Sequence, residues 1–194
     1  MADSNKVKFG LSNVYYAIAT LASDGTATYG SPKAIPGAVS LSMPASSNRS
    51  VFYADNIEYY VSSGATSREG TLTVAKIPDG FYTDIFSMVT DTEGAMIDNV
   101  NSAVVHFALT FEFSGDANKT RHVLYNCTAT RPAIGSETTN ESVTPVTEEI
   151  PLQCSSIWDS VNEIYTDHAK VAYGSSPYAT WNEAIYQTAA ATTT

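Results

Sequence analysis

The chain has 194 residues, a formal net charge of −10 at pH 7 and a sequence pI near 4.5, and only 15% of its residues are charged, against about 25% in an average soluble domain. Phosphate contacts need clustered Lys and Arg, so ten scattered basic residues argue against ordinary nucleic-acid binding. The length fits one domain over residues 1–194, and we find neither a signal peptide nor an apolar run long enough to span a membrane.

The first half of the chain predicts strands. In "NVYYAIATL", Val14, Tyr16 and Ile18 alternate with the residues of the other face, which is the period of a β-strand. "GAVSLSM" predicts a short strand that follows a Pro- and Gly-containing break. "IEYYVSS" and "EGTLTVAKI" predict a hairpin that turns at Gly64 and Ala65.

One segment predicts an α-helix over about residues 79–90. Asp79 is a suitable N-cap and Gly94 follows the end of the pattern. The apolar stripe is formed by Phe81, Ile85, Met88 and Val89. A single helix among strands normally covers the side or mouth of a sandwich or barrel.

The second half predicts a long antiparallel hairpin. "AVVHFALTFEFSGD" alternates strictly, and "RHVLYNCTATR" follows after a turn-forming segment. Period two predicts one buried face and one face that is wet or covers a partner. "IPLQCSSI" and "HAKVAY" predict further strands, and a less regular apolar pattern over about residues 178–187 predicts a short C-terminal helix. The fold class is therefore mainly β, a two-sheet β-sandwich or barrel with a flanking helix.

Three segments lie outside these elements. We expect residues 1–10 to form a flexible N-terminal arm, and residues 44–56 and 132–148 to form extended loops. Residues 155–194 form a C-terminal extension whose part in the fold the sequence leaves open.

No pattern of catalytic or metal-binding residues emerges. His106 and His122 lie on neighbouring predicted strands, but a metal site needs a third ligand, and neither Glu112 nor Asp116 stands at a recognisable spacing. No nucleophile-elbow motif or phosphate-binding loop is present. We therefore assign no catalytic, cofactor-binding or metal-binding residue and no cofactor. Cys127 and Cys154 are expected to be reduced structural thiols, because no export signal accompanies them.

The stretch "FYADNIEYYV" is unusually aromatic. Phe52, Tyr53, Tyr59 and Tyr60 fall within ten positions. Two interpretations stay open: sheet packing for alternate members with interface contacts for the rest, or a platform that stacks against sugars. Tyr is frequent at protein interfaces because it buries apolar area and keeps a polar tip.

Several segments resemble, in order and spacing, the major tail protein of long-tailed, non-contractile bacteriophages (siphophages) of Gram-positive hosts. They are "KVKFGLSNVYYA", "YGSPKAIPGAVSLSM", "FYADNIEYYV", "GTLTVAKIPDGFYTDIF" and "FALTFEFSGDANKTRHVLYNCTATRP". The match runs from about residue 6 to residue 132 and continues more loosely beyond.

This resemblance implies a structural virion protein without enzymatic activity. Family members form hexameric rings that stack into a tail tube, the conduit for genome delivery, and the fold implied is the β-sandwich or barrel of tail-tube proteins. Implied partners are the chain itself and other tail proteins such as the tape measure, tail terminator and distal tail proteins. DNA passes through the lumen without specific binding, and the implied location is the virion, after assembly in the host cytoplasm.

From these observations we expect an assembly interface at Arg49, Phe52, Tyr53, Tyr59 and Tyr60, which would contact the next ring. We also expect residues 1–10 and 132–148 to become ordered on assembly. A rival hypothesis is a carbohydrate-binding β-sandwich on a phage or bacterial surface, with Tyr59, Tyr60 and Trp181 as its platform. A β-rich hydrolase is a third hypothesis and requires a cleft that holds an acid or histidine of shifted pKa.

Overall fold

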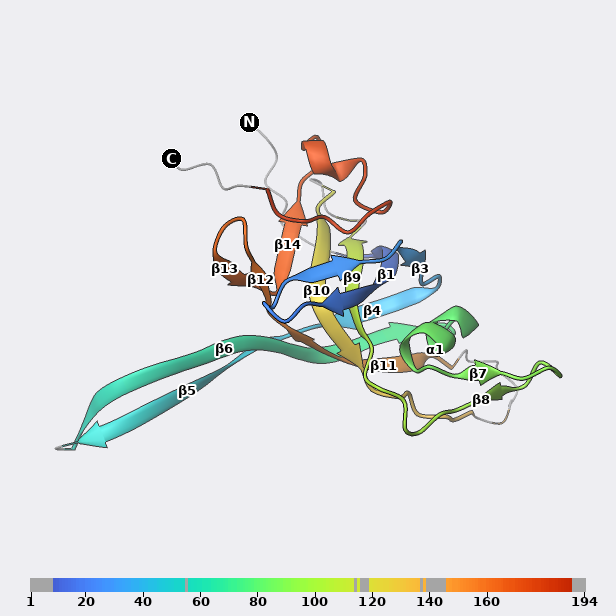
Figure 1. Cartoon of the computed structure of the whole chain (residues 1–194), viewed down its shortest axis with the longest axis horizontal. Helices are drawn as coiled ribbons and strands as arrows, with labels where there is room; N and C mark the ends of the chain where they lie inside the picture. Colours follow the sequence, from blue (N-terminus) through green and yellow to red (C-terminus); the bar gives the residue numbers. More distant parts are fainter. Residues whose placement is uncertain are drawn as a thin grey trace.

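The protein is mainly β, with one short α-helix in the described part of the chain (Figure 1). The structure is a computed structural model and describes residues 9–54, 56–113, 115, 119–136, 138 and 146–189; side chains are not described at 47–51 and 61–66. The predicted fold class is confirmed. Its main sheet holds β1 (Leu11–Leu21), β2 (Ala27–Tyr29), β3 (Lys33–Ala34), β4 (Ala38–Ser42), β5 (Ala45–Ala54), β6 (Ile57–Val74), β9 (His106–Phe113), β10 (Arg121–Ala129), β11 (Glu148–Ser155) and β14 (His168–Val171).

The main sheet is antiparallel and curls back on itself. Its order is β2-β1-β9-β10-β11-β6-β4, while β3 pairs with β1, β5 with β6 and β14 with β10. Because β3 leads directly into β4, the chain joins the β1 side of the sheet to the β6 side. The Ile35 N–H donates to the Val14 carbonyl at 2.8 Å, and the Ala75 N–H donates to the Gly37 carbonyl at 2.8 Å. Gly37 makes this corner with φ +76°, a conformation that suits glycine.

Several smaller elements lie outside the main sheet. The helix α1 spans Asp79–Ile85, and two short ribbons pair β7 (Val89–Thr90) with β8 (Met96–Ile97) and β12 (Ile157–Asp159) with β13 (Ile164–Thr166). A 3₁₀ turn, η1, covers Ser176–Tyr178. Within the described residues, no helix is both long and apolar enough to cross a membrane.

The larger part of the core lies inside the curled sheet. It collects inward-facing side chains of β1, β6, β9, β10 and β11, and α1 closes it with Phe81 and Ile85. The Phe81 ring stands edge-on to Tyr16 and Phe107, with ring centroids 5.0 and 5.7 Å apart. Edge-to-face contacts of this kind add to the burial of apolar area that stabilises the core.

A second cluster covers the opposite face of β9 and β10. It contains Ala108, Val123 and Tyr125 together with Trp181 and Ile185 from the C-terminal segment. The prediction of one wet or partner-covering face for this hairpin is therefore wrong, although the hairpin itself is confirmed. The covering residues are some 60 positions further along the chain, where the alternation of β9 carries no information about them.

The predicted helix over 79–90 is confirmed in place but ends earlier, at Ile85. Asp79 is its first residue, and Pro78 takes the N-cap position. Ser87 has φ 55°, and the N–H groups of Phe86 and Met88 both donate to the Tyr82 carbonyl, at 3.1 and 3.2 Å. This left-handed closing turn terminates the helix. Val89 consequently lies exposed in β7 rather than on the helical stripe.

Two further predictions need correction in the C-terminal half. Residues 178–187 run from the end of η1 through turns into irregular chain instead of forming an α-helix, although Trp181 and Ile185 are buried as the apolar pattern implied. Cys127 and Cys154 are joined in a disulfide across β10 and β11, so the prediction of reduced thiols is wrong. The two cysteines are 27 positions apart in the chain, and only the register of the sheet sets them opposite each other.

Candidate assembly surface

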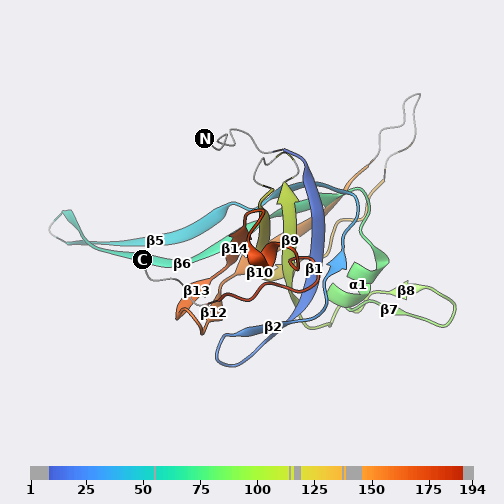
Figure 2. The same cartoon turned by 90° about the horizontal axis from the view of Figure 1, so that it is seen from above.

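The β5–β6 hairpin projects from the body as a long arm (Figures 1 and 2). The strand β6 has 18 residues, which at about 3.3 Å per residue corresponds to roughly 60 Å. Its C-terminal part, from Arg68 onward, pairs with β11 and β4, whereas in the described chain the preceding part pairs with β5 alone. The hairpin is therefore anchored in the sheet at its base and is a two-stranded ribbon beyond it.

This arm corrects two predictions. The predicted loop over 44–56 is mostly β5, and the predicted turn at Gly64 and Ala65 lies inside the continuous strand β6. The strands β5 and β6 instead pair as far as Ala54 and Ile57, so the chain turns between these two residues, and Asn56 adopts φ 60°. Asn tolerates this left-handed conformation, so the Asp–Asn pair was the turn signal that the sequence interpretation missed.

The base of the arm requires a residue without a side chain. At Gly70 a Cβ atom would lie 1.8 Å from the carbonyl oxygen of Ser42, the last residue of β4. The two backbones approach this closely where β4 leads into β5. Glycine at this position therefore lets the arm leave the sheet at its present angle.

The tip of the arm is apolar and open to solvent. We define the arm tip as Phe52, Tyr53, Ile57, Tyr59 and Tyr60, whose exposed fractions lie between 60% and 69%. The four aromatic residues were predicted from sequence, and Ile57 was missed. None of the four packs in the sheet core, which removes the interpretation in which alternate members do so. Apolar groups gathered in this way mark surfaces that bind a partner.

The fifth predicted interface residue, Arg49, lies on β5 opposite Ser63, between the arm tip and the body. Its side chain is outside the described part of the structure. Residues 1–8, 137 and 139–145, which carry most of the two segments expected to become ordered on assembly, are likewise outside it. Those two expectations stay predictions.

The histidines do not form a metal site. His106 Nδ1 lies 2.7 Å from Asn126 Oδ1, and His122 Nδ1 lies 3.0 Å from His168 Nε2, so the two predicted neighbours do not face each other. Glu112 instead pairs with Arg121 at 3.0 Å. Among the described residues there is no group of three or more His, Cys, Asp or Glu that could hold a metal ion; Asp116 is not among them.

One small cavity is relevant to the hydrolase hypothesis, because an acid of shifted pKa lies in its wall. It has about 100 Å³ and lies between β2, β12 and the C-terminal segment, with Tyr29, Tyr125 and Asp159 in its wall. Burial raises the pKa of both tyrosines. Burial also acts to raise the pKa of Asp159, but hydrogen bonds from the Thr188 and Asn162 side chains and from two backbone N–H groups outweigh it and lower that pKa. These hydrogen bonds make Asp159 a structural anchor for the β12–β13 turn.

The platform of Tyr59, Tyr60 and Trp181 that the rival carbohydrate-binding hypothesis requires does not form. Trp181, in the C-terminal segment, is buried against β9 and β10 with 1% of its surface exposed, and its Nε1 donates to the His122 carbonyl at 3.3 Å. Tyr59 and Tyr60 stand at the far end of the arm. The three residues therefore cannot stack on one ligand.

Comparison with known proteins gives a family match over almost the whole chain. A family model described as "Phage tail tube protein" matches residues 2–192. A search of curated proteins finds no significant match. Among solved structures, the anti-feeding prophage cap that terminates the AFP tube, determined by cryo-EM, is 12% identical with a TM-score of 0.41, over 88% of this chain and 97% of that one.

Proposed function

The chain belongs to the phage tail tube protein family, and we propose that it self-assembles into stacked hexameric rings that form the tail tube of a siphophage. The tube is the conduit through which the genome leaves the virion. The chain would be a structural subunit without catalytic activity, assembled in the host cytoplasm together with proteins such as the tape measure, the tail terminator and the distal tail protein.

The observation that carries this proposal is the arm. A two-stranded ribbon is marginally stable by itself in water, and this one ends in five exposed apolar side chains. Exposing them has a cost that burial against a neighbour removes, at about 25 cal/mol per Å² of apolar area. We therefore assign the arm tip and Arg49 to the contact between successive rings.

The charge of the chain fits a conduit. Double-stranded DNA carries one negative charge per about 1.7 Å, so a basic wall would hold the genome through counterion release. A subunit with net charge −10 offers no such general attraction. Within each ring the subunits would join by a heterologous contact, which closes when six copies complete one rotation.

The test is assembly of an arm variant. Phe52→Ala with Tyr53→Ala should abolish tubes or shorten them to single rings, as seen by negative-stain electron microscopy and sedimentation. A matched control is Tyr165→Ala with Tyr173→Ala, because these two side chains are 74% and 68% exposed on the body rather than the arm. Full-length tubes of normal stability from the arm variant would contradict the assignment. A stable monomer with measurable glycan binding would favour the rival carbohydrate-binding function.

A further inference from the structure

A preformed apolar groove lies beside α1, far from the arm. It has a volume of about 300 Å³ and lies between α1, the β7–β8 ribbon and the segment after β10. Its apolar lining, which we call the socket, consists of Tyr82, Phe86, Met88, Met96, Pro132 and Ile134. The volume is at the lower end of sites that enclose a small ligand, so the socket suits side chains rather than a whole strand.

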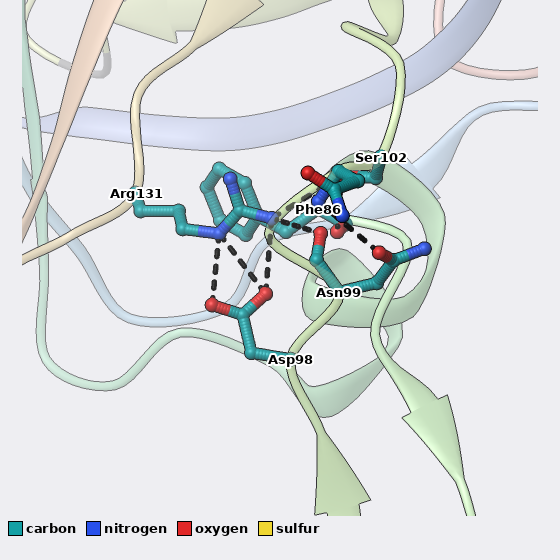
Figure 3. A network of polar contacts seen from close by, with 6 residues as sticks. Phe86, Asp98, Asn99, Ser102 and Arg131 are labelled. Carbon is teal, nitrogen blue, oxygen red and sulfur yellow. Dashed lines mark hydrogen bonds and ion pairs between the residues drawn. The ribbon is translucent and has the colours of Figure 1, made fainter.

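The mouth of the socket is held by a polar network (Figure 3). Arg131 Nε donates to both carboxylate oxygens of Asp98 at 3.0 Å, and its Nη2 donates to the Asn99 carbonyl at 2.8 Å and to Ser102 Oγ at 3.2 Å. Ser102 Oγ in turn donates to the Phe86 carbonyl at 3.3 Å. The network ties the end of α1 to the irregular segment after β8 and to the segment after β10, so the socket exists before anything binds. Preorganisation of this kind lowers the entropy cost of binding.

The surface around the socket is also apolar. Ile134 on its wall is fully exposed, and Val89 and Ile97 from the β7–β8 ribbon are more than half exposed. Methionine side chains such as Met88 and Met96 adapt to irregular shapes and make favourable contacts between sulfur and aromatic rings. The chemistry of the socket therefore calls for an aromatic, apolar partner.

The same chain carries such a group at its other end. Figures 1 and 2 both place the arm at one end of the long axis and α1 with the β7–β8 ribbon at the opposite end. The arm of a subunit therefore points away from its own socket, and an arm that fills the socket must come from a second copy. Complementary patches at opposite ends of one molecule give a head-to-tail contact, which repeats from copy to copy.

The exposed area is of the right order for such a contact. Aromatic side chains bury about 150–250 Å² each, so four of them, each at least 60% exposed, offer roughly 400–600 Å². A standard interface uses about 800 Å² on each partner. One arm in one socket would thus bind weakly, whereas several such contacts between two rings act together and hold strongly.

We propose that the socket receives the arm tip of a neighbouring copy of this chain and that this contact joins successive rings. The inference rests on the proposed function, because it takes the copies to be subunits of one tube. It adds the receiving surface, namely α1, the β7–β8 ribbon and the segment after β10.

Cysteine cross-linking tests the pairing directly. Ile57→Cys keeps all four aromatic residues of the arm tip, and Met96→Cys lies in the socket. The two native cysteines are buried in their disulfide and do not compete. We expect a mixture of the two single variants, oxidised under conditions in which tubes form, to give cross-linked dimers that neither variant gives alone. Val161→Cys replaces Met96→Cys in the control, because Val161 is exposed in the β12–β13 turn and away from the socket.

The outcomes separate the two proposals. Tubes without a cross-link between positions 57 and 96, or with equal cross-linking to position 161, would overturn the socket and leave the proposed function standing. A wild-type protein that forms neither rings nor tubes in these conditions would contradict the proposed function, and the socket would fall with it.

A charge variant gives an independent measurement. Met96→Glu should raise the protein concentration needed for tube formation by about tenfold or more, as is typical when a central interface residue is lost. Val161→Glu should leave that concentration unchanged, and thermal unfolding checks that both variants are folded. Tyr53→Lys combined with Met96→Glu should recover part of the loss, which a merely structural role of Met96 would not permit. Normal assembly of the Met96→Glu variant would overturn the proposal.

Discussion

At the scale of single residues, Arg121 connects the β9–β10 hairpin to the C-terminal segment that covers it. Its Nε pairs with Glu112 at 3.0 Å, its Nη1 donates to the Tyr178 carbonyl at 2.7 Å, and its guanidinium lies 4.0 Å from the centre of the Tyr178 ring. The side chains of Arg121 and Glu112 are only 16% and 10% exposed. Removing one partner of such a pair leaves a charge that is neither solvated nor compensated.

Arg121→Ala should therefore lower the free energy of unfolding by about 3 kcal/mol and make the segment after η1 more sensitive to protease. Urea unfolding followed by circular dichroism measures the first effect, and limited proteolysis measures the second. Lys33→Ala is the control, because Lys33 pairs with Asp84 but is 56% exposed, and such pairs contribute about 0–1 kcal/mol. Equal losses in the two variants would show that Arg121 does not anchor the segment.

At the scale of elements, the β9–β10 hairpin and the β5–β6 hairpin show opposite outcomes. The β9–β10 hairpin was predictable because its residues alternate strictly. Successive residues of each strand face the main core and the C-terminal segment in turn. The second was misassigned because the Ser-, Thr- and Gly-containing middle of β6 shows no alternation, and only pairing with β5 makes it a strand. The aromatic tip was nevertheless found from sequence, since its clustering does not depend on the position of the turn.

The disulfide between β10 and β11 is also an element-scale feature, because it joins two paired strands. A cross-link over 27 positions restricts the unfolded chain by about 3.5 kcal/mol in the chain-entropy account. Reduction of the folded, oxidised protein should lower the free energy of unfolding by about 3 kcal/mol, measured by urea unfolding with and without reductant. The variant with Cys127→Ala and Cys154→Ala should not respond to reductant. Two thiols that react in unfolded, unreduced protein would show that the bond is absent.

At the scale of the whole molecule, the subunit is strongly acidic, and in our proposal the apolar patches at its two ends hold successive rings together. The net charge of −10 makes free subunits repel each other. Screening shortens the reach of that repulsion from about 30 Å at 0.01 M salt to about 3 Å at 1 M. Burial of the arm tip is not weakened by salt in the same way.

Tubes should therefore form at a lower protein concentration as salt rises over this range, by about tenfold if screening removes about 1.4 kcal/mol of repulsion per subunit. Light scattering over a series of protein and salt concentrations measures the shift. For the variant with Phe52→Ala and Tyr53→Ala, added salt should lower that concentration little. Salt still weakens the repulsion between subunits, but the variant lacks the apolar contact that would hold them together. Dissolution of tubes at high salt would show that ion pairs, and not the arm tip, hold the rings.

The sequence by itself determined the β class, the strands at β1, β4, β9 and β10, the helix start and the aromatic group of the arm tip. Local periodicity and composition decide these features, and the colinear segments carry the family resemblance. Only the tertiary structure decided that the arm tip stands at the end of a long hairpin, that Trp181 covers a sheet face, and that Cys127 meets Cys154. The socket beside α1 is also decided only by the tertiary structure. Its lining residues, which range in the chain from Tyr82 to Ile134, are brought together by packing and by the hydrogen bonds of Arg131, and no local sequence pattern encodes either.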